Sequence, residues 1–407
     1  MYGLYDYNIL TNAEWHVMKE EKMINVAIIG CGNISGSHLE SYSKFQDRCK
    51  IVALVDIFPE KAQKKKELFN LTDAVVFASH EEMLASDISI DLISNCTPPY
   101  VHSSISINCM NKGLHVLVEK PMATCLAECD EMLEVQKRNN VILSCGAQNR
   151  FLNIISKLKE LADSGIAGKV RCAHVDSLWW RGHCYYDLWW RGTWEKEGGG
   201  PTLNHAVHQI DMINWIQNEL PAEVTAVLSN VMHDNSEVED LSFAILKYAD
   251  GALAEVTSSV VHHGGTQSVV LQCENAKIAA PFSVAAEKSK PNGFGEPNDE
   301  LVNAITQKYN AIQDRSHESF DGEIDNVLSA IENGTEPLIT GKDGRMTVEL
   351  ITAIYKSGCL KQTVTLPIAK DDEFYTFDGI LKNAIRFYEK SKSVEELGSA
   401  PITTGDY

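Results

Sequence analysis

The sequence lacks long hydrophobic runs, and its longest apolar stretches are no longer than a β-strand. A helix that spans a membrane needs about 20 consecutive apolar residues, so no membrane-spanning segment is predicted. The N-terminal residues also lack the basic, apolar and small-residue succession of a secretory signal peptide. We therefore expect a cytoplasmic protein that has no membrane partner.

Positive charge is scarce as well. The chain has 36 Lys and Arg residues against 56 Asp and Glu residues, a net charge of −20, which repels phosphate polymers unless a basic patch overrides it. The one lysine cluster, residues 64–66, stands beside Lys61 and Glu67 in a predicted helix and indicates a solvated helix face. The sequence therefore predicts no nucleic-acid partner.

Paired cysteine motifs are missing. The eleven cysteines are odd in number, are scattered, and never form CxxC; Cys125 and Cys129 come nearest to a pair of metal ligands. This usage excludes a disulfide-stapled secreted domain and favours a reducing compartment.

What the sequence does have is the size and composition of about two packed domains. It has 407 residues, of which 44% are hydrophobic and 23% are charged. In residues 23–147, short apolar runs alternate with helical stretches, which predicts an α/β domain, because parallel strands need crossover helices. The expected strands are residues 24–29, 51–55, 74–77, 91–96, 115–118 and 141–145.

Residues 148–407 follow a different pattern, with longer stretches of alternating polarity that indicate antiparallel strands in a second, α+β domain with a C-terminal tail. Residues 285–299 predict a surface loop, and residues 345–357 predict an apolar-striped helix. For residues 1–22, an N-terminal extension, the sequence leaves open a docking arm or a disordered leader. The expected strands are residues 170–178, 222–231, 241–248, 252–261 and 267–273, with a hairpin turn at residues 248–251.

A glycine-rich turn lies between the first predicted strand and the first predicted helix, where a dinucleotide-binding turn belongs. Gly30 permits the tight turn, and Gly32 lets a pyrophosphate approach the backbone. The helix start supplies amide dipoles for negative charge, so Asn33 and Ile34 are also predicted to contact the cofactor. Ser35 replaces the third glycine of the motif with another small residue.

Asp56 ends the second predicted strand, 20 residues after Gly36. A carboxylate at this position accepts hydrogen bonds from the ribose hydroxyls of NAD and repels the 2′-phosphate of NADP. The sequence therefore predicts NAD as the cofactor and disfavours NADP, although Lys61 or Lys64 would support some NADP binding.

Three further groups of residues resemble motifs of the Gfo/Idh/MocA oxidoreductase family. They are Cys96-Thr97-Pro98-Pro99 with His102, Glu119-Lys120-Pro121, and Gly198-Gly199-Gly200 followed by His208 and Asp211. The resemblance extends from Met23 to about Pro367. The Glu-Lys-Pro tripeptide after a Rossmann strand and the triple glycine before HxxD are specific in combination.

The resemblance implies a Rossmann domain followed by a domain whose open, mainly antiparallel sheet has one face available for oligomer contacts, and hence a homodimer or homotetramer. It also implies a site between the domains. His208 would face the substrate carbon, with Arg150 close by. The residues that the resemblance places around the dinucleotide are Thr97, Pro98, His102, Glu119, Lys120 and Gln148.

Oxidation of a secondary alcohol needs a hydride acceptor and a base within hydrogen-bond reach of the hydroxyl. Lys120 suits this site, because an amine beside the oxygen stabilises developing alkoxide and a positive nicotinamide lowers the pKa of that amine. His208 suits proton acceptance, because the ordinary pKa of histidine lies near neutrality. We predict both as catalytic residues that also contact the substrate.

Asn204, His208 and Asp211 stand at helical spacings of four and three, which predicts one shared helix face. By the family likeness many relatives have aspartate in place of Asn204; an amide orients the imidazole or binds a substrate hydroxyl but cannot stabilise imidazolium by charge. His205, His208 and Asp211 are alternative metal ligands, but His205 is rotated about 100° from Asn204 around a helix. The family implies no metal, and we predict none.

Aromatic residues gather just before the triple glycine, in Trp179-Trp180-Arg181-Gly182 and Trp189-Trp190-Arg191-Gly192. Sugars stack their apolar faces on aromatic rings, and arginine binds their hydroxyls, so the segment predicts a saccharide pocket. Tyr186, Trp190 and Arg191 are the predicted substrate contacts, and core or interface packing is the alternative.

Three functions fit these predictions. The leading one is a dehydrogenase or reductase that acts on a sugar, glycoside or cyclitol with NAD. The second is a glycosidase that uses bound NAD transiently and returns the hydride, and the third is a cofactor-binding sensor without turnover. Net NADH formation distinguishes the first function from the second, and the presence of Lys120 and His208 disfavours the third.

Overall fold

The computed structural model describes residues 23–395 and residue 397, so the predicted N-terminal extension lies outside the described residues. The first six strands form a parallel sheet, as predicted, and the strand order is β3-β2-β1-β4-β5-β6. Ala27 and Ile28 of β1 point to opposite faces, and both are buried because helices cover both faces of this sheet. The strands are β1 (Ile24–Ile29), β2 (Cys49–Val55), β3 (Val75–Phe77), β4 (Leu92–Asn95), β5 (His115–Val118) and β6 (Leu143–Cys145).

Helices from both halves of the chain cover this parallel sheet. Leu39 and Tyr42 of α1 share a core cluster with Ile324 and Leu328 of α10, which lies within the range predicted as the second domain. Residues of α4 and α5 belong to the other large core cluster, which continues into the second sheet. The helices are α1 (Ile34–Tyr42), α2 (Pro59–Leu68), α3 (His80–Leu84), η1 (Pro99–Val101), α4 (His102–Met110), α5 (Leu126–Asn139) and α10 (Ser319–Asn333).

The second sheet is mixed and mainly antiparallel, with the order β13-β12-β11-β7-β10-β9-β8-β16. Within the described residues, β7 and β10 are the one pair of neighbouring strands in this sheet that runs parallel. The predicted turn at residues 248–251 joins β9 to β10 as an antiparallel hairpin. The strands are β7 (Val170–Trp180), β8 (Glu223–Ser229), β9 (Leu241–Lys247), β10 (Leu253–Ser259), β11 (Val261–Cys273), β12 (Lys277–Ala280), β13 (Ser283–Ala285) and β16 (Val364–Thr365).

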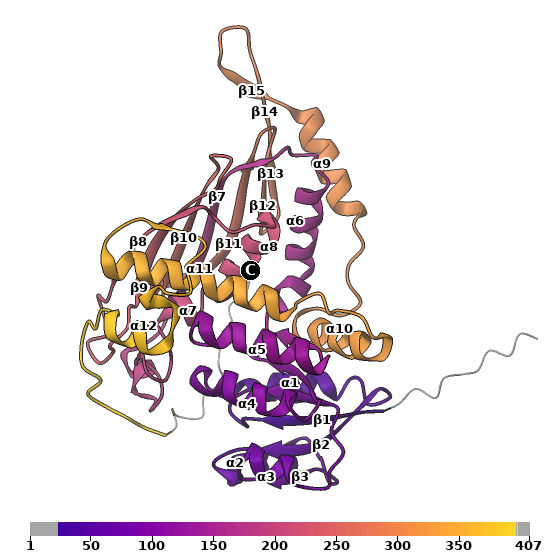
Figure 1. Cartoon of the computed structure of the whole chain (residues 1–407). Coiled ribbons are helices and arrows are strands. Elements are labelled where there is room, and N and C mark those ends of the chain that lie inside the picture. The colour runs from indigo at the N-terminus through magenta and orange to yellow at the C-terminus, as the bar shows by residue number, and fades with distance from the viewer. Residues whose placement is uncertain (1–22, 396, 398–407) are drawn as a thin grey trace, which may run out of the picture.

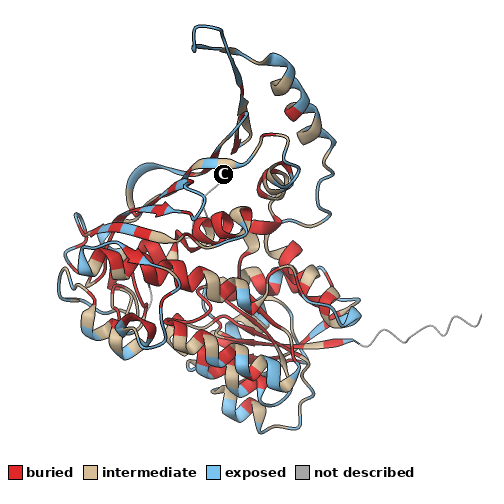
Figure 2. Ribbon diagram, turned by 45° about the horizontal axis from the view of Figure 1, so that its top comes forward, coloured by how far each residue is buried: buried red, intermediate tan, exposed pale blue. Residues whose placement is uncertain are grey.

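A helical layer separates the two sheets. Figure 1 shows α11 lying under the second sheet and α5 beneath it, above the parallel sheet. Figure 2 shows that this layer is largely buried. None of the helices among residues 23–395 has the length and apolarity that crossing a membrane requires. The remaining helices are η2 (Gln148–Phe151), α6 (Asn153–Asp163), η3 (His183–Asp187), α7 (Pro201–Asn204), α8 (Val207–Gln217), α9 (Asp299–Ala311), α11 (Gly341–Leu360), η4 (Glu373–Tyr375) and α12 (Phe377–Asn383).

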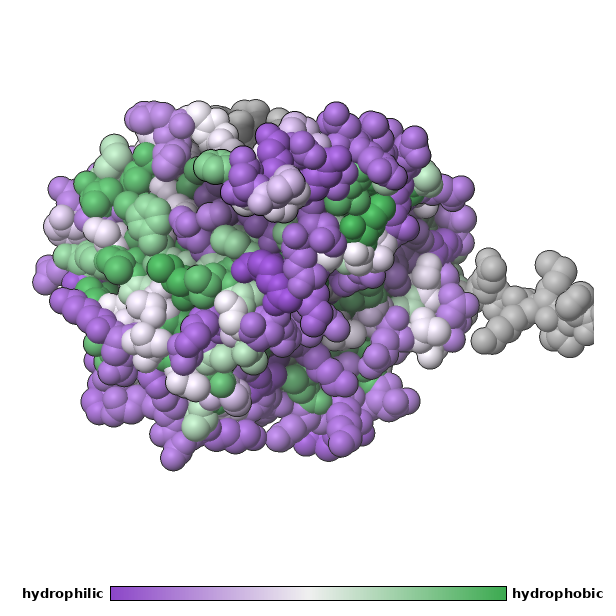
Figure 3. Space-filling model, turned by 90° about the horizontal axis from the view of Figure 1, so that it is seen from above, coloured by the Kyte–Doolittle hydropathy of each residue, from purple (hydrophilic) through white to green (hydrophobic). Residues whose placement is uncertain are grey.

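The face of the second sheet that points away from the helices is exposed and partly apolar. Along β8 and β9 the side chains alternate between buried and accessible positions, as expected for a sheet packed on one face. Val227, Phe243 and Ile245 are exposed on these strands by 67%, 49% and 57%. Figure 3, seen from above, shows apolar side chains gathered on this part of the surface.

The segment predicted as a surface loop is instead a short hairpin. β14 (Glu287–Ser289) and β15 (Gly295–Pro297) pair in an antiparallel manner, and Figure 1 shows the hairpin projecting from the end of the second sheet. Gly293, with a φ of 81°, provides the turn between the strands. The prediction of a structureless loop was wrong because three-residue strands are too short to show an alternating pattern.

Candidate active site

The glycine turn packs tightly against the loop that follows β4. A Cβ atom on Gly30, whose φ is 90°, would lie 2.7 Å from the carbonyl carbon of Cys96. At Gly32 nothing lies within 4 Å of the position that a Cβ atom would take, so the backbone there is open to a ligand. Ser35 donates from Oγ to the Gly32 carbonyl at 2.7 Å, which fixes the turn at the start of α1.

Asp56 holds the same turn in place. Its Oδ2 accepts a hydrogen bond from the Cys31 backbone N–H at 2.7 Å, and its Oδ1 accepts from Phe58 at 2.9 Å. Each oxygen retains a lone pair for a ribose hydroxyl. Lys65 of α2 also lies near the turn, since its Nζ is 2.9 Å from the position of a Cβ atom on Gly36; the sequence argument named Lys61 and Lys64 but missed Lys65.

His102 connects two loops of the site. Its Nδ1 lies 2.7 Å from the Pro121 carbonyl, and its Nε2 lies 2.7 Å from the Thr97 carbonyl. Thr97 in turn donates from Oγ1 to Asn95 at 2.6 Å, and Pro98 precedes η1. Because both ring nitrogens of His102 bind backbone carbonyls and the side chain is buried, it positions the Thr97 loop and presents no free nitrogen to a dinucleotide.

The Glu119 side chain is buried, and both of its oxygens bind groups of the protein. Its Oε1 lies 2.8 Å from Nε2 of His38 on α1, and its Oε2 accepts from the Lys120 backbone N–H at 3.1 Å. Burial acts to raise the pKa of Glu119, but His38 and Lys120 more than offset it and hold that pKa at about 2. The pair therefore fixes the backbone from which the Lys120 side chain extends.

Lys120 reaches across to the triple-glycine segment, where its Nζ donates to the Asn204 carbonyl at 2.8 Å. The helix predicted after the glycines is broken here: α7 ends at Asn204, and α8 begins at Val207. Ala206 donates back to Pro201 at 2.8 Å, so the Asn204 carbonyl is left out of the helical ladder and accepts from Lys120. The Asn204 amide nitrogen donates to the carbonyls of Gly199 and Gly200, so a role of Asn204 toward the His208 imidazole or a substrate hydroxyl stays a prediction.

The triple glycine is required by what packs against it. A Cβ atom on Gly199 would lie 2.1 Å from the Tyr355 hydroxyl, and one on Gly200 would lie 2.0 Å from the Glu239 carbonyl. Glu239 accepts from Gly200 and Thr202 at 3.1 Å each and from Tyr355 at 3.0 Å. Burial raises the pKa of Glu239 to about 7. Neither Glu239 nor Tyr355 has a local sequence signal that marks this role.

Two histidines near Lys120 and one glutamine keep unpaired polar atoms. Nδ1 of His208, Nδ1 of His205 and Oε1 of Gln148 are buried without a hydrogen-bond partner among the described residues. Burial lowers the pKa of His208 to about 3, and Lys120 adds to the shift. This pKa lies well below the near-neutral value from which the sequence predicted proton acceptance by His208. Lys120 and His208 together line a small cavity that is otherwise mostly apolar.

Arg150 does not face the substrate. Its guanidinium donates two hydrogen bonds of 2.7 Å to Asp211 and one of 3.0 Å to Asp343 of α11, and its side chain is 1% exposed. The predicted substrate contact at Arg150 is therefore contradicted by a buried ion pair. With Asp211 engaged in this way, the alternative set of metal ligands loses its carboxylate. No set of three or more His, Cys, Asp or Glu side chains in the described part of the chain is arranged to hold a metal.

The aromatic segment, residues 179–192, has some side chains in the core and others that remain partly accessible at the site. Tyr186 is buried and packs edge-on against His233 at a centroid distance of 4.9 Å, so its predicted role as a substrate contact was wrong. Arg191 lies over the rings of Trp190 and Tyr185 at 4.2 and 4.3 Å and pairs with Glu197 at 2.9 Å. Trp190 and Arg191 remain accessible in part, and Arg191 contributes to lowering the pKa of Lys120.

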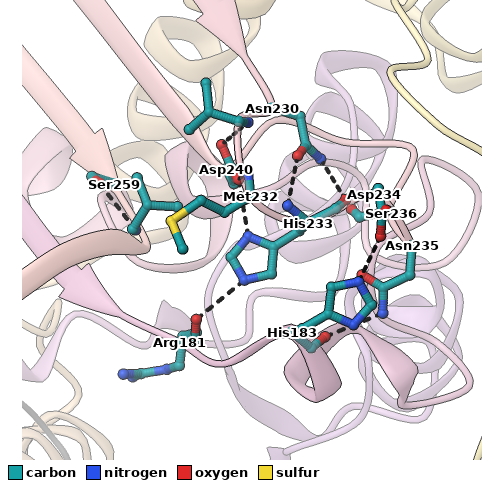
Figure 4. A network of polar contacts seen from close by, with 12 residues as sticks. Arg181, His183, Asn230, Met232, His233, Asp234, Asn235, Ser236, Asp240 and Ser259 are labelled. Atoms are coloured by element: carbon teal, nitrogen blue, oxygen red, sulfur yellow. Dashed lines mark hydrogen bonds and ion pairs between the residues drawn. The ribbon is translucent and has the colours of Figure 1, made fainter.

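Two other segments hold the aromatic segment in place. One is the loop between β8 and β9, in which Asn235 donates to the His183 carbonyl at 3.1 Å and to Asp187 at 2.9 Å; Figure 4 shows Asn235 beside His183. The other is residues 385–395, the C-terminal strap, in which Lys390 donates to the carbonyls of Tyr186, Leu188 and Arg191. Lys392 pairs with Asp187 at 2.7 Å. The pocket wall is thus fixed by residues distant in sequence.

The described residues suit NAD. The turn at Gly32 is open to a pyrophosphate, and Asp56 lies at the end of β2 with lone pairs available to a ribose. Beside Lys120 the unpaired nitrogen of His208 offers a hydrogen bond to a nicotinamide or a substrate, and the oxygen of Gln148 is also buried without a partner. These features lie at the carboxyl ends of parallel strands, where dinucleotides bind in this architecture.

Known proteins resemble this chain over most of their length. The myo-inositol 2-dehydrogenase of Thermotoga maritima is 26% identical over 347 residues, which cover 84% of this chain and 98% of that protein. The 2,7-anhydro-N-acetylneuraminate hydratase of Mediterraneibacter gnavus is 28% identical over 257 residues, 62% of this chain and 65% of that protein. The solved WlbA dehydrogenase of Chromobacterium violaceum, in complex with NADH and UDP-GlcNAcA, has a TM-score of 0.74 at 26% identity, and covers 86% of this chain and 98% of its own.

Two family models match consecutive parts of the chain. Residues 24–147 match the oxidoreductase family with an NAD-binding Rossmann fold, and residues 155–279 match the C-terminal domain of the same family. The two matches include the glycine turn, the Glu119-Lys120-Pro121 tripeptide and the triple glycine. The chain belongs to the Gfo/Idh/MocA family of oxidoreductases and has its NAD-binding Rossmann domain.

Proposed function

We propose that the protein is an NAD-dependent dehydrogenase that transfers a hydride between nicotinamide and a secondary alcohol carbon of a sugar, glycoside or cyclitol. The observation that carries the proposal is the half-buried Lys120 amine, held 2.8 Å from the Asn204 carbonyl and lining one cavity with a neutral His208. Similarity to an inositol 2-dehydrogenase and to a dehydrogenase solved with NADH supports it. NAD supplies the hydride acceptor when it is bound.

In this proposal Lys120 accepts the proton of the substrate hydroxyl. Burial lowers the pKa of Lys120 from 10.5, and Arg191 lowers it further, although Glu119 opposes both effects. A lower pKa increases the fraction of neutral amine at physiological pH, and only the neutral amine accepts a proton. The hydrogen bond to Asn204 holds the nitrogen at one side of the cavity.

His208 orients the reacting oxygen in this proposal. With a pKa of about 3 the His208 imidazole is neutral and weakly basic. It therefore suits a hydrogen bond to the substrate hydroxyl better than acceptance of the hydroxyl proton. The unpaired Nδ1 is one of the two ring nitrogens available for this bond. Lys120 and His208 thus have different roles, and both converge on one oxygen.

NADH absorbance tests the proposal most simply. The full chain is incubated with NAD and a panel of free sugars, alkyl and aryl glycosides, inositols and sugar nucleotides. We expect stoichiometric NADH from one class of substrate. Lys120→Met should reduce the rate by about a thousandfold or more, with NAD affinity nearly unchanged, whereas Lys112→Met, at an exposed position after α4, should behave like the unaltered protein. Turnover that is unchanged in Lys120→Met would remove this residue from the mechanism.

A redox-neutral reaction is the alternative function. Its support is the similarity to a 2,7-anhydro-N-acetylneuraminate hydratase, although this similarity covers less of the chain than that to the inositol dehydrogenase. In such a reaction the hydride returns to the sugar after elimination, so no NADH accumulates. Release of an aglycone, or hydration of an anhydro-sugar, without net NADH would favour this alternative.

We also propose that the protein is a cytoplasmic homodimer or homotetramer. All eleven cysteines are free thiols, which suits a reducing compartment. Val227, Phe243 and Ile245 form an exposed apolar patch on β8 and β9, and a second copy of the same patch would bury it. The patch is the surface that we assign to subunit contacts.

A further inference from the structure

Two guanidinium groups lie against one aromatic ring at the substrate side of the site. The central carbons of Arg181 and Arg191 are 5.6 and 4.3 Å from the ring centroid of Tyr185. Arg181 also lies 5.0 Å from the ring of Trp179. Ring faces attract cations, so this platform holds two like charges close together.

The same charges act on His205, together with Lys120. The His205 ring is buried, 5.6 Å from Trp179 and 5.9 Å from Tyr185 between ring centroids. Burial lowers the pKa of His205 well below its ordinary value, and Arg181, Lys120 and Arg191 lower it further. Three cations therefore surround one neutral imidazole, although the whole chain has a net charge of −20.

The two arginines differ in how their charge is balanced. Arg191 pairs with the buried Glu197 at 2.9 Å. Arg181 forms no ion pair with a carboxylate among the described residues, and its Nη1 donates to the Trp180 carbonyl at 2.9 Å. The Arg181 side chain also hydrogen-bonds to that of Tyr185. A guanidinium has five N–H donors, so the remaining donors of Arg181 are available to a ligand.

Arg181 is also fixed at its backbone. Its N–H donates to the Val260 carbonyl at 2.8 Å, and its own carbonyl lies 3.1 Å from Nε2 of His233. His233 is held in turn by Asp240 at 2.9 Å. Figure 4 shows the contacts of His233 with the Arg181 carbonyl and with Asp240, and shows the Arg181 side chain directed away from them. The cation therefore extends from a rigid base, which reduces the entropy that binding a ligand would lose.

Building on the proposed function, we propose that the substrate is a sugar with an anionic group, a carboxylate or a phosphate ester, and that Arg181 binds this group. The planar guanidinium fork matches the oxygens of both groups. The rings of Trp179 and Tyr185 lie beside it, where the apolar face of a sugar ring can stack. Lys120 and His208 are left for the reacting hydroxyl.

Matched pairs of substrates test this proposal with the full chain and NAD. One pair is methyl glucuronide and methyl glucoside, and the other is glucose 6-phosphate and glucose. We expect kcat/KM to be about tenfold higher for the anionic member of one pair, with the advantage reduced by added NaCl. The preferred pair distinguishes a carboxylate from a phosphate.

Variants show whether Arg181 is the source of the preference. Arg181→Gln should lower the ratio of kcat/KM between the anionic and neutral members about tenfold, and Arg181→Lys should retain part of it. Arg171→Gln is the matched control, because Arg171 lies on β7, the strand that Arg181 follows, but pairs with Glu274 and Asp250 at an exposed position. Its ratio should equal that of the unaltered protein.

The results separate this proposal from the proposed function. Equal kcat/KM for both members, with no effect of Arg181→Gln on the ratio, would overturn the anionic substrate and leave the dehydrogenase intact. If no NADH forms, calorimetric binding to the NADH-loaded protein decides. Tighter binding of an anionic member that Arg181→Gln abolishes supports the anion site while contradicting the dehydrogenase, and equal binding overturns the anion site.

Discussion

At the scale of single residues, Lys120 sets the expected pH dependence. Because the neutral amine accepts the proton, kcat/KM for alcohol oxidation should rise with pH, with a midpoint below the ordinary lysine value of 10.5. Arg191 lowers the pKa of Lys120, so Arg191→Gln should move this midpoint to higher pH. Initial rates across the pH range measure both effects. A limb that falls as pH rises, or a midpoint that moves down in Arg191→Gln, would contradict the role of Lys120.

Asp56 determines the expected cofactor preference. Asp56→Ser removes the carboxylate that we assign to the ribose, and it also removes the hydrogen bonds to Cys31 and Phe58. The second loss affects NAD and NADP alike, so the ratio of their dissociation constants isolates the first. We expect NAD binding to weaken more than NADP binding, as measured by fluorescence titration. Equal losses for the two cofactors argue against the ribose assignment.

Gly199 has no side chain, and this allows Tyr355 to pack against the backbone of the triple glycine. In Gly199→Ala the new Cβ would lie 2.1 Å from the Tyr355 hydroxyl, and overpacking of this kind costs about 1–3 kcal/mol of unfolding free energy. We expect that loss in urea denaturation, with a lower kcat because the Asn204 carbonyl that binds Lys120 shifts. Gly182→Ala is the control, because its nearest neighbour would be an ordinary 3.5 Å away. Equal stability of the two variants would contradict this packing.

At the scale of elements, local pattern predicted most strands and long helices, because each repeats a spacing over several residues. The strands of the parallel sheet, β7 to β11 of the second sheet and most of α11 are where the sequence indicated them, whereas β12, β13 and β16 were not predicted. The prediction of one continuous helix after the triple glycine was wrong. The helix breaks at His205, and this break depends on Lys120 and Glu239, which lie far away in sequence. The Arg150–Asp211 pair was missed for the same reason: side chains 61 residues apart leave no periodic signal.

The C-terminal strap gives a prediction at this scale. Lys390→Met removes hydrogen bonds to the Tyr186, Leu188 and Arg191 carbonyls, so the wall that carries Trp190 and Arg191 should loosen. We expect KM for the sugar to rise several-fold while the dissociation constant of NAD stays the same. Lys382→Met, on the exposed side of α12, should change neither value. An unchanged KM in Lys390→Met would show that the strap does not shape the pocket.

At the scale of the whole molecule, the exposed face of the second sheet should decide the oligomeric state. Replacing Phe243 and Ile245 with glutamate places charge in the patch that we assign to subunit contacts. Sedimentation velocity should show a dimer or tetramer that dissociates in this double variant. Leu68→Glu, at an exposed apolar residue on α2, should not alter the assembly. A monomer before any substitution would refute the proposed oligomer.

The central claim for the molecule is that a hydride passes between a sugar carbon and NAD with Lys120 as the proton acceptor. Its most direct test follows deuterium from the carbinol carbon of the preferred substrate into the cofactor by mass spectrometry. We predict one deuterium in each NADH formed, a slower rate with the deuterated substrate, and no transfer in Lys120→Met. NADH without deuterium, or product without any labelled NADH, would contradict the account.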